Sequence, residues 1–436
     1  MGYVGLCTAA TFASRGIGTV GIDIDEARVE QIRRGKAPVH EPRLDGMLRN
    51  AVRKKLLDAT TSVSSVADTN TTFLTVGTPS QQNGSINLSH IKNATEDIGK
   101  VLRENRGYHL VVVKSTVVPG TTNGTVKSSL EQASRKNVGP KLGLCANPEF
   151  LKEGTAINDA LHPDKIVIGS NDKKSASQLS KLYRRFYGSK LPPVILTSPE
   201  SAELVKYASN AFLATKVSFI NTIANIAQQI PGVDVGTIAD SIGLDPRIGE
   251  LFLKAGPGYG GSCFHKDIQA LINYSQSNGY DPILFRATEN ANERQANRVV
   301  EMAEKLFGSL SEKRIAVLGL AFKKDTDDIR EAASLRVINQ LKKKGAHIIA
   351  YDPMAIPNTK KQLLDQIEYA NNAHSALTGA DCAIIMTEWD EFRKLKSKDF
   401  QAHMKTPMIV DARRIFDPKE FNQLNYVAVG LGPSIP

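Results

Sequence analysis

Apolar runs alternate with segments of helical spacing along the first 200 residues. A parallel, doubly wound sheet has strands that are apolar throughout and are joined by helices. The sequence therefore predicts such a sheet near the amino end. Its strands lie within T-V-G-I-D-I-D (19–25), N-T-T-F-L-T-V-G-T-P (70–79), Y-H-L-V-V-V-K-S-T-V-V-P-G-T (108–121), K-L-G-L-C-A-N-P-E-F-L-K-E-G (141–154), D-K-I-V-I-G (164–169) and P-P-V-I-L-T (192–197).

The pattern changes at Pro199. From there apolar residues recur every three or four positions for about eight turns, which predicts one long helix that is buried between domains or subunits. Helical segments continue to about residue 307. A second alternating region then begins, with strands predicted in R-I-A-V-L-G (314–319), H-I-I-A-Y-D-P (347–353), D-C-A-I-I-M-T (381–387) and M-I-V-D-A-R-R (408–414).

The first residues carry part of a dinucleotide-binding motif. Gly2 and Gly5 occupy the second and third glycine positions of G-x-G-x-x-G, and Asp23 follows 18 residues after Gly5. In a Rossmann fold such glycines bring a pyrophosphate to a helix amino terminus, and the acidic residue binds the ribose. Asp23 favours NAD over NADP, although an ordinary helix start is the alternative. The motif's first glycine and the strand before it would lie ahead of Met1; without them, we expect weaker cofactor binding.

These patterns together predict an α/β protein with two Rossmann-like doubly wound parallel-sheet domains joined by a long central helix. The predicted boundaries are 1–198 for the amino-terminal sheet domain, 199–306 for the central helical domain and 307–436 for the carboxy-terminal sheet domain. A chain of 436 residues is long enough for two or three domains. Ligands of such sheets bind at the carboxyl ends of the strands, where Thr78, Thr116 and Glu153 fall.

The stretch A-G-P-G-Y-G-G-S-C-F-H-K-D (255–267) combines four glycines with Cys263, Lys266 and Asp267. Glycines allow close approach of a ligand to the backbone. A thiol is nucleophilic as its thiolate, which a nearby cation or helix amino terminus favours. The stretch therefore indicates a catalytic cysteine, with a glycine turn and a buried structural cysteine as the alternative.

Composition narrows the function classes. The net charge of +10 comes without stretches that interleave basic and aromatic residues, so a phosphate-bearing substrate is favoured over nucleic acid. The four cysteines form no metal-ligand spacing, which predicts free thiols and no metal. No signal peptide or membrane span is present in the sequence, and we expect a cytoplasmic protein.

Polar residues on two further segments are candidates for the site. Lys206 and Asn210 are four residues apart on the long predicted helix, so they share one face. Lys323, Lys324 and Arg413 follow predicted strands of the second sheet, where cations suit phosphates. For both groups, ordinary solvated surface residues are the alternative.

Six motifs in order now point to one family. The dinucleotide start is followed by V-G-T-P, K-S-T-V-V-P-G-T, N-P-E-F-L-K-E-G, K-Y-A-S-N-A-F, G-Y-G-G-S-C-F-H-K-D and G-L-A-F-K-K-D-T-D-D-I-R-E. Over essentially its whole length the chain closely resembles the UDP-glucose/GDP-mannose dehydrogenase family. The form G-S-C-F-x-K-D is most similar to the members that oxidise UDP-glucose. Members that oxidise GDP-mannose share G-S-C and K-D, so they are closer competitors than the N-acetylmannosamine branch, which more typically has G-H-C.

The resemblance implies an NAD-dependent, four-electron oxidation of the sugar C6 alcohol to a carboxylate. It implies that Cys263 forms a thiohemiacetal and then a thioester, and that Lys206, assisted by Asn210, stabilises the alkoxide and the oxyanion. Asp267, with Lys206 or through a water, would serve as base, and the sequence leaves open which group is the base at each step. Glu153 and Thr116 would position water for hydrolysis. The implied cofactor residues are Gly2, Tyr3, Val4, Gly5, Asp23, Arg28, Thr78, Thr116, Glu153, Lys266 and Arg330.

The resemblance also implies a set of residues that bind the nucleotide sugar. It further implies a homodimer through the central helices, in which Arg247 reaches the sugar of the neighbouring subunit. A plain surface arginine is the alternative for Arg247. The implied sugar-nucleotide residues are Phe150, Leu151, Lys152, Lys206, Asn210, Arg247, Phe252, Lys254, Gly258, Tyr259, Gly260, Phe322, Lys323 and Arg413.

The chain departs from the family pattern near its end. Where the family usually has V-D-G-R-N, this chain has Val410-Asp411-Ala412-Arg413-Arg414. The added Cβ and the extra charge put the base preference in question. Two other functions stay open: oxidation of another nucleotide sugar such as GDP-mannose, and nucleotide-sugar binding without turnover.

Overall fold

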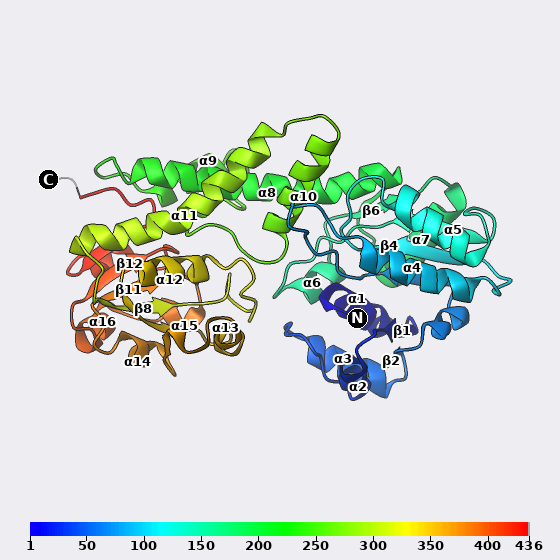
Figure 1. The fold of residues 1–436 in the computed structure, drawn as a ribbon, viewed down its shortest axis with the longest axis horizontal. Helices are drawn as coiled ribbons and strands as arrows, with labels where there is room; N and C mark the ends of the chain where they lie inside the picture. The colour runs from blue at the N-terminus through cyan, green and yellow to red at the C-terminus, as the bar shows by residue number, and fades with distance from the viewer. Residues whose placement is uncertain (435–436) are drawn as a thin grey trace. The chain divides into compact units, whose positions relative to one another are not determined.

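The computed structural model describes residues 1–434, which divide into two compact units (Figure 1). The first unit contains residues 1–209 and 269–278, and the second contains residues 210–268 and those from 279 onward. Both units are built on parallel sheets covered by helices, so the predicted α/β class with Rossmann-like sheets is confirmed. The predicted three-part division stays a prediction.

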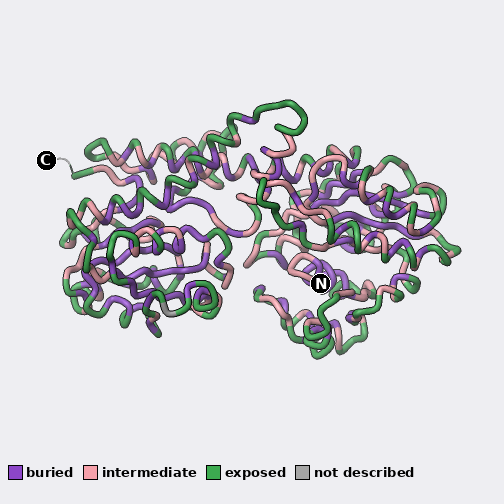
Figure 2. Tube along the Cα trace, in the orientation of Figure 1, coloured by how far each residue is buried: buried purple, intermediate pink, exposed green. Residues whose placement is uncertain are grey.

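In the first unit, five strands form a sheet in the order β3-β4-β5-β6-β7. Their apolar runs make β4 and β5 buried at every position, which places the sheet inside the core (Figure 2). A separate two-stranded parallel sheet pairs β1 with β2. The bounds are β1 Thr19–Ile22, β2 Leu57–Thr60, β3 Thr71–Leu74, β4 His109–Val113, β5 Leu142–Ala146, β6 Ile166–Gly169 and β7 Val194–Thr197.

One junction of this sheet is not parallel. β6 pairs with β5 in the antiparallel sense, at Ala146 and Gly169, whereas β3-β4-β5 and β6-β7 are parallel within themselves. The antiparallel pairing means that residues 147–165 return from the end at which β5 finishes instead of crossing the sheet. The N-P-E-F-L-K-E-G motif therefore stays at the carboxyl end of β5.

Helices cover this first unit. Phe12 of α1 packs with Leu110, Val112 and Cys145 of the five-stranded sheet, while Leu6 and Ala10 of α1 pack with residues of β2 and α3. The helical bounds are α1 Tyr3–Ser14, α2 Glu26–Arg33, α3 Leu44–Arg53, α4 Ser89–Leu102, α5 Lys127–Ser134, α6 Ala156–Leu161 and α7 Lys173–Tyr187, with short helical turns η1 Val63–Asp68, η2 Thr122–Val126 and η3 Gly188–Lys190.

The long helix predicted from Pro199 is α8, Pro199–Ala227, and it runs from the first unit into the second. Helix α10, Phe264–Ser277, follows Cys263 directly. Helix α11 ends at Phe307, as the helical spacing predicted. The remaining bounds of this region are α9 Val235–Gly243 and α11 Ile283–Phe307.

The second sheet has the order β10-β9-β8-β11-β12-β13, and its pairings are all parallel. Its four predicted strands are present, while the short edge strands β10 and β13 were not predicted. The bounds are β8 Arg314–Leu318, β9 His347–Tyr351, β10 Glu368–Tyr369, β11 Cys382–Ile385, β12 Met408–Asp411, β13 Asn425–Ala428, α12 Ala333–Lys343, α13 Ile356–Leu363, α14 Ala373–Leu377, α15 Asp390–Arg393, α16 Ser397–His403, η4 Leu364–Gln366 and η5 Pro418–Phe421.

Candidate active site

Cys263 stands at the amino end of α10. The Asp267 N–H donates to the Cys263 carbonyl at 2.9 Å, which is the first hydrogen bond of the helix. Cys263 is exposed, whereas Cys7, Cys145 and Cys382 are buried, and burial raises the pKa of all three buried thiols. The amino end of a helix favours negative charge. The exposed thiol therefore has the setting that a nucleophilic thiolate needs.

Asp267 lies one turn further along α10 and is 2 % exposed. The Asn210 amide of α8 donates to one of its oxygens at 2.6 Å, and the Lys266 ammonium contacts the other at 2.6 Å. A buried carboxylate needs such partners. Three predicted site residues, Asn210, Lys266 and Asp267, are thus brought together in the second unit.

The glycine loop 256–261 is held by buried polar residues of α8 and α11. The Gly256 N–H donates to Asn221, and its carbonyl accepts from Gln295. Asn292 binds both the N–H and the carbonyl of Tyr259, at 2.7 and 3.1 Å. A Cβ on Gly258, where φ is +101°, would lie 2.6 Å from the Asn292 side-chain oxygen, so this position requires glycine.

A second buried carboxylate supports this loop from α11. Glu289 accepts from the Tyr259 hydroxyl and contacts His265 Nδ1 at 2.5 Å. The hydrogen bond to Glu289 raises the pKa of His265 above its ordinary value, against the effect of burial. His265 lies two residues after Cys263, so Glu289 joins the glycine loop to the first turn of α10.

In the first unit, the buried Lys206 of α8 pairs with the half-buried Glu149. Lys206 Nζ lies 3.1 Å from a Glu149 oxygen and 5.6 Å from the ring centre of Phe150. Lys165 lies on the same ring at 4.7 Å. Glu149 and Phe150 belong to the N-P-E-F-L-K-E-G motif just after β5. The carboxylate that meets Lys206 here was not predicted; the prediction had selected the second glutamate of the motif, Glu153.

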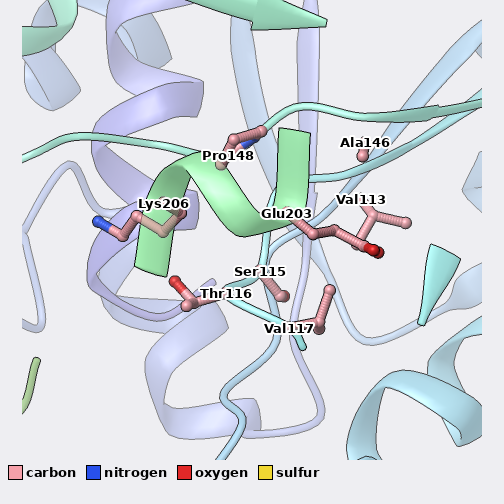
Figure 3. Close-up of a pocket in the computed structure, with 8 residues that line it drawn as sticks. All are labelled: Val113, Ser115, Thr116, Val117, Ala146, Pro148, Glu203 and Lys206. Carbon is pink, nitrogen blue, oxygen red and sulfur yellow. The ribbon is translucent and has the colours of Figure 1, made fainter. Parts of the chain in front are cut away.

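Thr116 and Lys206 line a small pocket of about 10 Å³, which is room for about one water molecule (Figure 3). Thr78 holds Thr116 in place, because its hydroxyl donates to the Thr116 carbonyl at 2.8 Å. Glu153 follows on the same edge and is half-buried. The pocket is lined by Val113, Ser115, Thr116, Val117, Ala146, Pro148, Glu203 and Lys206.

The dinucleotide motif fits its predicted role. Gly2 precedes the first residue of α1, and the first turn of α1 contains no acidic residue. A Cβ on Gly5 would lie 2.6 Å from the Thr75 hydroxyl, so glycine lets α1 approach the end of β3. The N–H groups of a first helical turn have no partner within the helix and suit a pyrophosphate. Tyr3 and Val4 belong to this turn; the Tyr3 hydroxyl donates to Glu41.

Asp23 follows β1, as an acidic residue for a ribose should. Its carboxylate lies 2.7 Å from the Met1 ammonium and 3.6 Å from Arg28. Partial burial raises the pKa of Asp23, but Met1, the Asp25 amide and Arg28 outweigh it and hold the pKa below its ordinary value. Asp23 is therefore a stable anion beside a helix amino terminus, which fits NAD.

Phe322, Lys323 and Arg413 come together in the second unit. Arg413 donates to the carbonyls of Met386 and Phe322 at 2.7 and 2.8 Å, and Lys323 lies 5.5 Å from the Phe322 ring centre. Arg414, the departure from the family pattern, has φ of +55° and donates to both oxygens of Asp234 at 2.6 Å. The extra charge is thus used in an ion pair within the protein.

The other predicted residues lie on exposed or half-buried loops. Arg247 pairs with Asp245 and its side chain is 88 % exposed. Arg330 pairs with Asp328, and the Arg330 carbonyl accepts from Gly261. The Phe252 ring lies 6.2 Å from the Phe264 ring, while Lys254 is exposed. In the first unit, Leu151 is half-buried and Lys152 contacts Asp159.

Several site residues escaped the prediction because they are polar residues inside otherwise ordinary helices. Glu289, Asn292 and Gln295 are spaced by three residues on α11 and are 1–3 % exposed. The sequence T-E-N-A-N-E-R-Q (288–295) does place a carboxylate and two amides three residues apart. Residues at this spacing share one face of a helix, so this pattern could have indicated a buried polar face.

The chain is similar to known proteins over nearly its whole length. Residues 1–187 match the NAD binding domain of the UDP-glucose/GDP-mannose dehydrogenase family, residues 200–294 its central domain and residues 316–418 its UDP binding domain. The UDP-glucose 6-dehydrogenase AglM of Haloferax volcanii is 43 % identical over 96 % of each chain. TuaD of Bacillus subtilis, a UDP-glucose 6-dehydrogenase, is 40 % identical over 99 % of this chain and 91 % of its own.

Among solved structures, a UDP-glucose dehydrogenase from Pyrobaculum islandicum superposes with a TM-score of 0.90 and 36 % identity, covering 99 % of this chain and 95 % of the other. The family resemblance expected from the six sequence motifs is therefore confirmed. The chain belongs to the UDP-glucose/GDP-mannose dehydrogenase family.

Proposed function

We propose that this protein is an NAD-dependent UDP-glucose 6-dehydrogenase that converts the C6 alcohol of UDP-glucose to the carboxylate of UDP-glucuronate. The observation that carries the proposal is the exposed Cys263 at the amino end of α10, one turn from the buried carboxylate of Asp267. Family membership and relatives that are named UDP-glucose 6-dehydrogenase support the choice of substrate.

The role of Cys263 follows from the two stages of the oxidation. An aldehyde at C6 cannot be oxidised further by hydride removal until a nucleophile adds to it. The Cys263 thiolate adds to the aldehyde carbon and gives a thiohemiacetal, whose oxidation yields a thioester on Cys263. Attack by water then releases the carboxylate and regenerates the thiol. The covalent bond keeps the aldehyde from leaving between the stages.

Lys206 and Asn210 supply positive charge and hydrogen-bond donors for the oxygen at C6. An ammonium and an amide stabilise an alkoxide or oxyanion as it forms. Both residues are four positions apart on α8, so they project from one face of that helix. Asp267, which is hydrogen-bonded to Asn210, serves as the base that removes the hydroxyl proton. Glu153 and Thr116 position the hydrolytic water, and the Glu149 carboxylate beside Lys206 adds to that set.

NAD, when bound, accepts the hydride removed at each oxidation stage. Gly2, Tyr3, Val4 and Gly5 hold the pyrophosphate at the first turn of α1, and Asp23 with Arg28 binds the adenosine ribose. We assign Thr78, Thr116 and Glu153 to the rest of the NAD molecule, with Lys266 and Arg330 as further cations. The carboxylate at Asp23 favours NAD because it repels a 2′-phosphate.

The nucleotide half of the substrate binds to cations and loops. Lys323 and Arg413 neutralise the diphosphate, and the glycine loop with Phe252, Lys254, Gly258, Tyr259 and Gly260 surrounds the sugar. Phe322 of the second unit and the segment Phe150–Leu151–Lys152 of the first are further residues that we propose for the sugar nucleotide. The anchoring of the loop by Asn221, Asn292 and Gln295 supports this role, because a rigid loop loses little entropy on binding.

A homodimer through the central helices is part of the proposal. Phe212, Phe219 and Ile226 of α8 are spaced by seven residues and are 65 %, 50 % and 53 % exposed. Seven-residue spacing places apolar side chains along one seam, which suits pairing of two copies of a helix. The exposed Arg247 reaches the sugar of the neighbouring subunit in this arrangement.

We place the protein in the cytoplasm because its four cysteines form no disulfide, as expected of a reducing compartment. None of the helices in the described part of the chain is long and apolar enough to cross a membrane. Nucleic acid and membranes are not proposed as partners.

The decisive experiment is NADH formation by the purified chain with NAD and UDP-glucose. The two stages of oxidation require about two NADH for each sugar consumed. GDP-mannose is the matched control substrate. Turnover with GDP-mannose and none with UDP-glucose would transfer the proposal to that sugar. Binding of UDP-glucose, measured by calorimetry, without NADH from either substrate would identify a non-catalytic binding protein instead.

A further inference from the structure

Glu203 is a buried carboxylate that the proposed reaction does not use. It lies on α8 three residues before Lys206 and is 4 % exposed. One of its oxygens accepts from the Gly120 N–H and the other from the Thr122 N–H, each at 2.7 Å. Figure 3 shows Glu203 and Lys206 leaving the same part of α8 in opposite directions, so Glu203 serves a different set of atoms from Lys206.

The two N–H groups belong to the loop that follows β4 and carries Ser115 and Thr116. On its other side this loop is fixed to the end of β3: the Ser115 hydroxyl donates to the Val76 carbonyl at 2.7 Å, and Thr78 donates to Thr116. Glu203 supplies the anchor from α8. Its carboxylate lies at the amino end of the helical run that begins at Thr122, where negative charge is stabilising.

Thr116 and Lys206 both line the pocket that has room for about one water molecule (Figure 3). Thr116 comes from the loop, and Lys206 comes from α8. The position of Thr116 relative to Lys206 therefore depends on the anchors at the end of β3 and on whatever holds the loop to α8. Glu203 does this with two charge-assisted hydrogen bonds, which are stronger than bonds between neutral groups.

We propose that Glu203 is a positioning residue, whose carboxylate fixes the 115–122 loop to α8 and so helps to hold Thr116 at the one-water pocket that Lys206 also lines. The catalytic part of this inference rests on the proposed function, in which these two residues act on the oxyanion and on the hydrolytic water. The anchoring part does not depend on the substrate.

The anchor is sensitive to pH. Burial raises the pKa of Glu203 to about 7, and the side chain and amide of Thr122 with the amide of Gly120 lower it only in part. The charged group that acts on Glu203 is Glu200, one turn earlier on α8, and its negative charge raises the pKa of Glu203 further. The loop faces Glu203 with uncharged groups of Gly120 and Thr122. Protonation leaves one oxygen as a hydroxyl, which cannot accept as well as a carboxylate oxygen does. The loop is therefore held more firmly above pH 7 than below it.

Stability must change in the opposite direction. The folded-state pKa of Glu203 is about 7, and the ordinary value is 4.5. Between these two values the folded chain binds more protons than the unfolded chain, so the contribution of Glu203 to stability falls as pH rises through this window. A residue that only stabilised the fold would not improve activity in the same pH range in which it reduces stability.

The test is the variant Glu203→Gln, with Glu131→Gln of α5 as the matched control, because the Glu131 carboxylate also accepts from a backbone N–H, that of Val138, but outside the loop. The glutamine keeps the size but places an NH₂ group against one of the two N–H donors. At pH 8 we expect kcat with UDP-glucose to fall about tenfold with KM little changed, since small misplacement of a catalytic group has effects of this size or larger. The rise of kcat through pH 7 disappears, while the denaturation midpoint at pH 8 does not fall.

Amide hydrogen exchange of the 115–126 segment gives a readout without substrate. Loss of one hydrogen bond speeds exchange about tenfold, and we expect this in Glu203→Gln but not in Glu131→Gln. If Glu203→Gln does not fold, Glu203→Asp is used; it keeps the charge, should retain the pH step and should give intermediate exchange.

A Glu203→Gln enzyme with unchanged kcat, unchanged pH profile and unchanged exchange would overturn the proposal. Faster exchange with unchanged kcat would reduce Glu203 to a structural anchor and overturn its positioning role. If the wild-type chain oxidises no nucleotide sugar and exchange still depends on Glu203, the proposed function fails and the anchor stands.

Discussion

At the scale of single residues, the four cysteines differ in reactivity because they differ in burial. Cys263 is exposed, whereas burial raises the pKa of Cys145 to about 12 and raises the pKa of Cys7 and Cys382 as well. Iodoacetamide should therefore modify Cys263 alone in the native protein, which peptide mass spectrometry can check. NADH formation should be lost in parallel with modification.

Substitution separates chemistry from binding at the same residue. Cys263→Ser keeps the size of the side chain but removes the thiolate, so we expect UDP-glucuronate formation to fall on the order of a thousandfold or more, as for other removed nucleophiles. UDP-glucose binding, measured by calorimetry, should be retained. Full UDP-glucuronate output from this variant would refute the nucleophile assignment.

His265 gives a pH-dependent prediction. Its hydrogen bond to Glu289 raises its pKa, with Glu331 raising it further and burial and Arg336 opposing. A histidine with a raised folded pKa stabilises the protein below pH 6.5 and loses this contribution as pH rises through the folded value. His265→Gln should therefore be destabilised by about 2 kcal/mol at pH 6.

The measurement for His265 is the free energy of unfolding from urea titrations at pH 6 and pH 9. The difference between wild type and His265→Gln should shrink between these two pH values. His347→Gln is a control, because His347 also contacts a glutamate but its side chain is 62 % exposed. An equal loss of stability at both pH values would mean that packing, and not the ion pair with Glu289, explains the effect.

At the scale of elements, α11 is the support of the glycine loop. Asn292 satisfies the N–H and the carbonyl of Tyr259, and both would be left buried without partners in Asn292→Ala. We expect a loss of about 2 kcal/mol in stability and a higher KM for UDP-glucose, because the loop loses its fixed shape. The Kd for NAD, measured separately by fluorescence quenching, should stay the same.

Asn297→Ala on the same helix is the control for Asn292→Ala. Its side chain contacts Gln340 on an exposed face and does not touch the loop. A KM for UDP-glucose that rises equally in both variants would show that α11 as a whole, not the Asn292 contact, determines sugar binding.

Elements with a single strong pattern were predicted correctly, and those that depend on tertiary contact were not. The long helix from Pro199 and the buried strands β4, β5, β8 and β11 followed from periodicity and apolar runs. The antiparallel direction of β6 relative to β5 was not predictable, because strand direction is decided by where residues 147–165 pack and not by the composition of β6. The two-residue strand β10 has too few residues to show a pattern.

At the scale of the whole molecule, motifs located the chemistry, but partners of the predicted residues came from distant sequence. Asn210 and Asp267 were both predicted, and their hydrogen bond joins residues 57 positions apart. Glu149, Glu203 and Glu289 were missed because a buried or half-buried carboxylate on a helix or loop has no distinctive spacing. Arg414 was recognised as a departure, but its partner Asp234 required the fold. The assigned site roles stay predictions until variants test them.

The dimer is the prediction that belongs to the whole molecule. Phe219 is the middle member of the exposed row on α8, and a charge there would have to be buried without a partner if two rows pack together. Wild type should elute in light-scattering chromatography at about twice the chain mass of 47.4 kDa, and Phe219→Glu at the chain mass itself.

The control for Phe219→Glu is Leu196→Glu, since Leu196 is 61 % exposed on β7 and lies outside the row. This variant should remain a dimer, because Leu196 lies outside the proposed interface. Dissociation of Phe219→Glu alone would then show that the α8 row holds the dimer, and not exposed apolar surface in general. Activity adds a second readout: if Arg247 reaches the neighbouring sugar, the monomeric Phe219→Glu should have a higher KM for UDP-glucose. A wild-type monomer with full activity would rule out both the interface and the role of Arg247 across it.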